Sequence, residues 1–270
     1  MQIKIGYDLQ FDVRQLTPMV LMLFVHPDRR RDLMAPDTLH VEPFVPIKLY
    51  TDAFGNIVGR INAPPGYLRL HSQTVIYDDV MHDQHDESAP EVPVHQLPDE
   101  VLQFLIASRY CEVDQLVQTA WNLFGQSPPG WHRVKAICNW VHTNVRFDYA
   151  CARPTKTAWD TYTEGTGVCR DFTHLALTFC RCMNIPARYA TGYLGDINVP
   201  IVPGAPMDFS ACFEAYLGGK WYVFDARFNT HRLGRILMAR GRDAADVALT
   251  TSFGQADLSK FFVICDEIVT

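Results

Sequence analysis

The sequence lacks any apolar run long enough to cross a lipid bilayer, since its longest one is Met19–Val25 (MVLMLFV). The N-terminal MQIKIGYDLQFDV has no basic segment followed by an apolar core, so we do not expect it to act as a secretion leader. Basic residues are not in excess: 24 Lys and Arg face 30 Asp and Glu, a net charge of −6, whereas duplex-binding surfaces are usually basic. These absences predict a cytoplasmic protein that binds neither membranes nor nucleic acids.

The eight cysteines include no C-x-x-C pair. Because zinc and redox sites usually show such spacing, a zinc or thiol redox protein is disfavoured, and we predict no metal and no cofactor. Disulfides are not needed either: 48% of the 270 residues are hydrophobic and only 20% are charged, which supports a large packed core. Most of these thiols are therefore expected to be reduced core residues.

Residues 1–80 have the pattern of β-structure. Apolar and polar residues alternate from Ile3 to Val13, which predicts a half-buried strand. Further strands are predicted over 19–25, 46–64 and 67–77, the second of these ranges containing a Gly55-Asn56 turn. We expect a small β-sandwich over 1–80, followed by an acidic, proline-containing linker over 81–97.

Helical periodicity begins at Pro98 and continues to residue 183. Helices are predicted over about 112–124, 130–145 and 169–183, followed by a strand over 187–194 and a hairpin over 208–227 with Gly218-Gly219 as its turn. We therefore predict a second domain over 98–270 and an α+β fold class, with helices packed on an antiparallel sheet.

Cys169 follows Gly165 and Gly167 at the expected start of a helix, in the stretch GTGVCRDFTH. Unpaired N–H groups and the macrodipole at a helix N-terminus favour a thiolate, and the same N–H groups can stabilise an oxyanion. His174 cannot be the base, because five residues at about 100° each place it roughly 140° around the helix from Cys169. Cys169 is therefore a candidate nucleophile, the alternative being a buried thiol at a helix start, and we expect His174 to be structural.

The hairpin supplies a candidate acid. Its two-residue turn places Asp225 opposite Cys212, with Asp208 and Ser210 on the same face of the sheet. A carboxylate in the apolar run before Arg227 is costly to bury unless it is paired. Asp225 is therefore a candidate for orienting an imidazole, the alternatives being a cap of the strand end or an ion pair with Arg227.

These blocks resemble a known family. Residues 167–172 (GVCRDF), 180–189 (CRCMNIPARY) and 192–194 (GYL), with the hairpin after them, are similar to the bacterial transglutaminase-like domain. The resemblance is strong over 98–227, and the β-rich region before it is similar to one often attached to such domains. It implies a papain-like core in which a cysteine thiolate attacks a carboxamide, ammonia or an amine leaves, and water or an amine resolves the thioester.

The resemblance also implies residue roles. Cys169 corresponds to the nucleophile and Asp225 to the partner of the catalytic histidine. The family usually shows Asp-x-His-Ala-Trp-x-Glu-x-Tyr, but residues 208–216 here are DFSACFEAY, so Ser210 occupies the histidine position. Serine cannot act as a base at neutral pH, and loss of a general base typically costs about 10²–10⁴-fold in rate.

Two hypotheses follow. In the first, His231 folds back over the thiol as the base, and the protein is a cysteine peptidase, amidase or transglutaminase-like enzyme acting on a peptide or protein. Hydrolysis is then favoured over cross-linking, because nothing indicates a dedicated amine site, and the pKa of Cys169 should lie below that of a free thiol. In the second, the domain is degenerate and binds a peptide or protein without turnover. The oligomeric state is left open.

Overall fold

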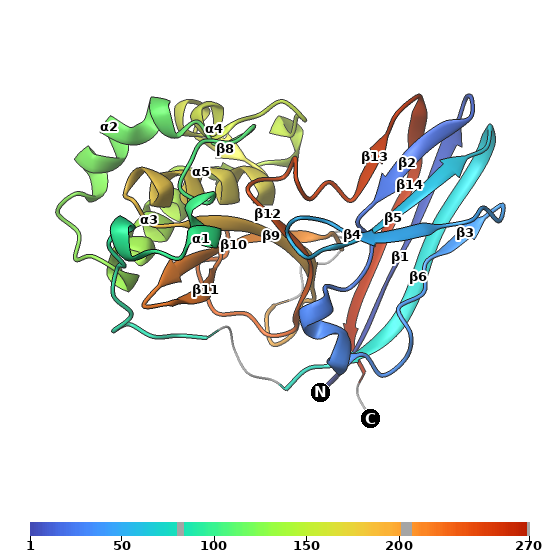
Figure 1. The fold of residues 1–270 in the computed structure, drawn as a ribbon, viewed down its shortest axis with the longest axis horizontal. Helices are drawn as coiled ribbons and strands as arrows, with labels where there is room; N and C mark the ends of the chain where they lie inside the picture. The colour runs from blue at the N-terminus through green and yellow to red at the C-terminus, as the bar shows by residue number, and fades with distance from the viewer. Residues whose placement is uncertain (80–83, 201–206, 269–270) are drawn as a thin grey trace.

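The computed structural model describes residues 1–79, 84–200 and 207–268. The chain forms two lobes, one made of β-strands and one with helices packed on a sheet (Figure 1). This confirms the predicted α+β fold class. Residues 80 and 81–83, where the linker was expected to begin, lie outside the described residues. None of the described helices combines the length and apolarity that a membrane crossing requires.

The β lobe is a sandwich of two four-stranded sheets, in the orders β14-β1-β6-β3 and β13-β2-β5-β4. Alternate residues of β1 are buried between the sheets, as the period-two pattern predicts. The strands are β1 (Gln2–Val13), β2 (Thr17–Leu21), β3 (His40–Glu42), β4 (Lys48–Thr51), β5 (Ile57–Ala63), β6 (Gly66–Tyr77), β13 (Thr250–Ser252) and β14 (Ala256–Glu267).

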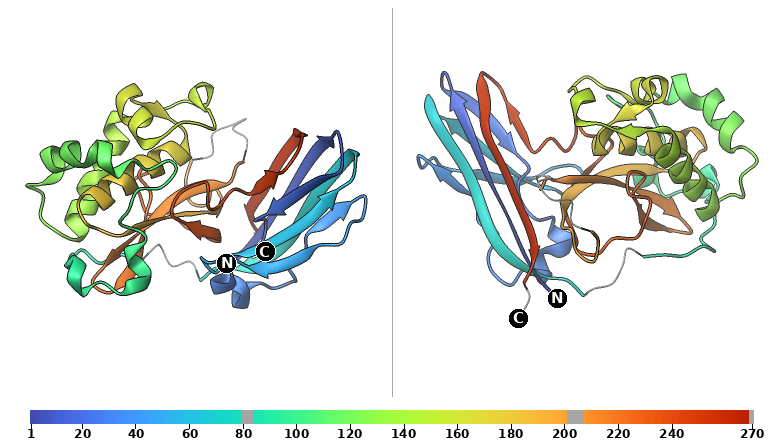
Figure 2. Two further views of the ribbon diagram at one scale, coloured as in Figure 1. Left: turned by 45° about the horizontal axis from the view of Figure 1, so that its top comes forward. Right: turned by 180° about the vertical axis from the view of Figure 1, so that it is seen from behind.

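The last two strands, which lie in the range 98–270 predicted as the second domain, are part of the β lobe. β14 pairs antiparallel with β1 along its whole length, from Ile3 opposite Glu267 to Val13 opposite Ala256. Seen from behind, β14 runs beside β1, at the edge of the β lobe (Figure 2). Local sequence could not indicate this pairing, because β14 is exposed over most of its length and its partner lies at the other end of the chain.

The helical lobe is built on the antiparallel sheet β11-β10-β9-β12. Its strands are β9 (Ala187–Leu194), β10 (Ser210–Leu217), β11 (Lys220–Phe224) and β12 (Arg235–Gly241). Its helices are α1 (Asp99–Leu102), α2 (Val113–Phe124), α3 (Trp131–Asn144), α4 (Ala158–Glu164) and α5 (Cys169–Cys182). Short elements complete the fold: β7 (Arg146–Phe147), β8 (Thr166–Gly167), and the 3₁₀ turns η1 (Pro27–Asp32), η2 (Val94–Gln96) and η3 (Tyr149–Cys151).

Helix α5 is the centre of this lobe. It packs against β9 and β10 on one side and against α2, α3 and α4 on the other, so every residue from 171 to 182 is buried. The buried guanidinium of Arg181 fixes its far end, donating to the carbonyl oxygens of Ala187 (3.0 Å) and Ile106 (3.1 Å). The N-terminus of α5 is thereby held at a fixed place above the sheet.

The hairpin has the predicted register. Glu214 lies opposite Val223, and both turn glycines have positive φ, 56° at Gly218 and 86° at Gly219. Left-handed backbone at two successive positions is the geometry of a tight hairpin turn, which glycine adopts without strain. Ser210 and Asp225 therefore end up at the same end of the hairpin.

The lobes are joined by apolar and ionic contacts. The ring of Phe209 packs against Tyr7 of β1 (centroids 6.3 Å apart) and Tyr193 of β9 (5.1 Å). Arg240 of β12 binds Glu214 of β10 (2.9 Å) and also Asp28 of η1. The β lobe thus supports the strands that carry the hairpin face.

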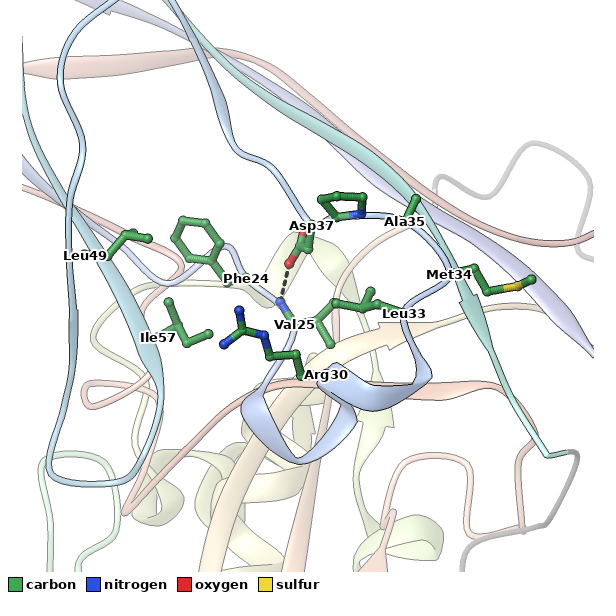
Figure 3. A pocket seen from close by; sticks show the side chains of 10 residues that line it. Phe24, Val25, Arg30, Leu33, Met34, Ala35, Asp37, Leu49 and Ile57 are labelled. Carbon is green, nitrogen blue, oxygen red and sulfur yellow. Dashed lines mark hydrogen bonds between the residues drawn. The ribbon is translucent and has the colours of Figure 1, made fainter.

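The β lobe has a cavity of its own, of about 500 Å³, beside η1 (Figure 3). Its walls are mainly apolar, including Phe24, Leu33 and Ile57, with Arg30 and Asp37 as the charged groups. The Asp37 carboxylate accepts the Val25 N–H (2.6 Å), and burial raises its pKa. Asp37 therefore supports the fold of this segment.

Candidate active site

Cys169 is the first residue of α5, as predicted. The chain turns into the helix over Gly167, where a Cβ atom would lie only 2.7 Å from the Cβ of Asp171. Asp171 is fully buried and its carboxylate accepts the Val168 N–H (3.0 Å), which caps the helix. Glycine is required for this close approach, and the cap fixes the thiol at the helix mouth.

The backbone N–H groups of Cys169 and Arg170 make no hydrogen bond to other described residues. They belong to the first turn, where helical N–H groups lack intrahelical partners. These groups and the positive end of the α5 macrodipole are therefore available to a negatively charged oxygen near the thiol.

Cys169, which is partly buried, lines two adjoining cavities. The first has a volume of about 510 Å³ and the second about 540 Å³. Three residues line both cavities: Cys169, Asp208 and Phe209. The walls of the first include Tyr110, Arg153, Arg170, Tyr189 and Val247, and those of the second include Tyr149, Ser210, Arg227, Phe228 and Arg232. An extended substrate that occupied both cavities would pass over the sulfur of Cys169.

The resting thiol is protonated at neutral pH. Burial raises the pKa of Cys169, and the negative charge of Asp208 raises it further. The Ala211 N–H, which donates to the sulfur, and the Arg227 guanidinium lower this pKa but do not reverse the shift. The sequence predicted a pKa below that of a free thiol for an active enzyme, and this shift has the opposite direction. Nucleophilic attack from this thiol therefore needs a proton acceptor.

Asp225 is committed to structural contacts. Its Oδ1 accepts the N–H groups of Arg227 and Phe228, both at 3.0 Å, and its Oδ2 pairs with Arg235 at 3.0 Å. It thus combines a cap of the strand end with an ion pair, but the cation is Arg235 of β12 and not Arg227. Neither oxygen contacts an imidazole among the described residues.

His231 does not reach the cavities that the thiol lines. It is exposed, its Nε2 lies 2.9 Å from Nδ1 of His85, and it lines a separate small cavity with Asp225 and Trp131. The geometry therefore brings together Asp225 and His231, and separately Cys169 and Ser210. The predicted role of His231 as base stays a prediction that this arrangement does not support.

Ser210 stands in the second cavity, at the start of β10, as the resemblance implies for the position of the base. Its buried Oγ has no hydrogen-bond partner among the described residues. His174, in contrast, is structural as predicted: it is buried, stacks on Tyr110, and accepts the Ala244 N–H at Nε2 (3.1 Å). Burial lowers the pKa of His174 and keeps it neutral.

Asp208 is the site residue for which the sequence indicated no role. It lies in both cavities beside Cys169, and its carboxylate forms no ion pair within the described part of the chain. Burial raises its pKa, while the Phe209 N–H and the Arg227 charge lower it. Its place two residues before Ser210, on the same face of the hairpin, was the available signal.

No group of three or more His, Cys, Asp or Glu side chains that could hold a metal ion occurs within residues 1–79, 84–200 and 207–268.

Together, the helix-borne thiol and the sheet beneath it define a papain-like α+β cysteine domain. Residues 118–226 match the transglutaminase-like superfamily. The chain is also similar to a crystal structure from Cytophaga hutchinsonii of a protein provisionally described as a cysteine protease, with 31% identity and a TM-score of 0.86 over 100% of this chain and 91% of that chain. This protein therefore belongs to the transglutaminase-like superfamily.

Two other similarities are weaker. An uncharacterized Mycobacterium leprae protein, ML0607, is 29% identical over 152 residues, which is 56% of this chain and 53% of that protein. This chain thus matches about half the length of that relative. The periplasmic domain of TgpA from Pseudomonas aeruginosa has 14% identity and a TM-score of 0.42, covering 84% of this chain and 90% of that chain.

Proposed function

We propose that this protein catalyses thiol-dependent acyl transfer or hydrolysis at peptide or carboxamide bonds, through a thioester on Cys169. The observation that carries the proposal is the position of the thiol at the N-terminus of α5, where two cavities of about 510 and 540 Å³ meet. One cavity has room for the acyl part of a substrate and the other for its leaving group.

The chemistry follows from this position. The sulfur attacks the carbonyl carbon, the free N–H groups of Cys169 and Arg170 stabilise the developing oxyanion, and the amine or ammonia leaves. Water then resolves the thioester. Hydrolysis is favoured over cross-linking, because the sequence indicated no dedicated amine site.

A second candidate is a domain of the same fold that binds a peptide or protein without turnover. The observation that favours it is that no described histidine lines either cavity, while Asp225 is bound to Arg235. We further propose that the protein, whether enzyme or binding domain, works in a reducing compartment such as the cytoplasm. The eight free thiols support this location.

The first proposal predicts a covalent acyl adduct on one cysteine. Incubation with peptide carboxamides and peptide p-nitroanilides, followed by acid quenching and peptide mapping by mass spectrometry, should locate the acyl mass on Cys169. The matched control is Cys151→Ala, which removes a half-buried thiol that lines neither cavity. That variant should form the adduct at an unchanged rate. Acylation on Cys151, or no adduct with any substrate, contradicts the proposal.

A further inference from the structure

The charged group that shares both cavities with the sulfur is a carboxylate. Asp208 and Cys169 line the first and the second cavity together, whereas each arginine of these walls lines only one of them. Asp208 forms no ion pair with the described residues, and Phe209, which follows it, is anchored between Tyr7 and Tyr193. The backbone that carries the carboxylate is thus held by both lobes.

Resting on the proposed acyl-transfer function, we propose that Asp208 is the catalytic base, taking the proton from the Cys169 thiol and delivering it to the leaving amine. In this role Asp208 replaces the catalytic histidine of the family, whose position is occupied by Ser210. The structural basis is that Asp208 is the acidic residue that lines both cavities together with Cys169, while both oxygens of Asp225 are already bound.

The steps balance. The S–H bond breaks as the proton moves to the Asp208 carboxylate and the sulfur forms a bond to the carbonyl carbon. The C–N bond then breaks, and the carboxylic acid returns the proton to the departing amine. In the second half, Asp208 takes a proton from water, the hydroxide oxygen bonds to the acyl carbon, and the C–S bond breaks. The thiolate regains the proton from Asp208, so both residues end as they began.

The surroundings make the transfer feasible. Burial raises the pKa of the Asp208 carboxyl, which makes it a stronger base than an exposed aspartate. The Ala211 N–H and Arg227 stabilise the thiolate that forms. Charge is conserved in the transfer, because one anion replaces another in the same cavity. The groups that face Asp208 from the neighbouring elements are Cys169 on α5, Tyr149 on η3 and Arg227 after β11.

Asp208→Asn tests this role because two readouts should change in opposite directions. The negative charge of Asp208 raises the pKa of the thiol, so its removal should speed alkylation of Cys169 by iodoacetamide at pH 7 several-fold. Acylation by a peptide p-nitroanilide should instead slow about 10²-fold or more. It should recover at alkaline pH, where the thiol ionises without a base. In the wild type, acylation should fall as pH drops through the raised pKa of Asp208.

The controls separate the possible failures. Asp208→Glu keeps the carboxylate and should retain acylation within about tenfold, which keeps the test valid if the asparagine variant folds poorly. Asp114→Asn removes an exposed carboxylate on α2 of the same lobe and should change neither rate. Unchanged acylation in Asp208→Asn overturns the role of Asp208 while leaving the Cys169 thioester intact. Absence of acylation in the wild type overturns the proposed function itself, and the base with it.

Discussion

Replacing Cys169 by alanine is expected to abolish turnover while peptide binding persists. The sulfur is the only atom of the site that can form the acyl bond in the proposed mechanism, so the rate of amide cleavage should fall on the order of 10⁴-fold or more. The two cavities owe their shape to the residues around the thiol, such as Phe209 and Tyr189, and losing one sulfur atom leaves them open. Ammonia or p-nitroaniline release measures turnover, and fluorescence anisotropy of a labelled peptide measures binding.

This pair of measurements also separates the two candidate functions. An enzyme loses turnover in Cys169→Ala and keeps its affinity, whereas a binding domain has no turnover to lose in the wild type. Cys151→Ala should match the wild type in both assays, because Cys151 lines neither cavity. Full amide cleavage by Cys169→Ala would show that the chemistry resides elsewhere on the protein.

The parts of the fold that the sequence predicted well have strong local patterns. Helix α5 carries an apolar stripe and glycines before its first turn, and the predicted range 169–183 matches Cys169–Cys182 closely. The hairpin is determined by its two glycines, so the register of Glu214 and Val223 followed from counting residues. In both cases the information lies within a few turns of the chain.

The parts that the sequence did not predict depend on contacts between distant segments. β14 pairs with β1 across almost the entire chain, and nothing in its exposed, irregular pattern identifies that partner. The same applies within the site. Asp225 was correctly seen as a carboxylate that needs a partner, but the partner comes from β12, whose position relative to β11 depends on the whole sheet.

The role proposed for Asp208 could not be predicted from the local sequence either. The sequence placed it on the hairpin face, but a carboxylate becomes a candidate base only when burial and a nearby thiol are known. The family pattern directed attention to position 210, where a serine stands. The functional residue inferred from the structure lies two residues earlier, just before β10 begins, and it lines the same cavity as Ser210.

Asp225→Ala is expected to destabilise the fold by about 3–5 kcal/mol, the usual result of breaking a buried ion pair by removing one partner. The side chains of Asp225 and Arg235 are only 3% and 11% exposed, so the pair is poorly screened by water. The substitution also leaves the N–H groups of Arg227 and Phe228 without their acceptor. Urea denaturation followed by circular dichroism measures the loss in free energy of unfolding.

The matched control is Asp257→Ala, which breaks an exposed ion pair with Arg14 whose side chains are 64% and 66% exposed. It should cost less than about 1 kcal/mol, because solvent screens such a pair. Combining Asp225→Ala with Arg235→Gln should destabilise the protein by less than the two single losses added together, since the residues act as one unit. If Asp225 instead orients a catalytic imidazole, Asp225→Ala would lower acylation of Cys169 with little loss of stability. A large loss of stability, with acylation preserved in the remaining folded protein, would show that the Asp225 carboxylate serves to hold β12 to the hairpin. Another group that lines the cavities would then have to accept the proton of the thiol.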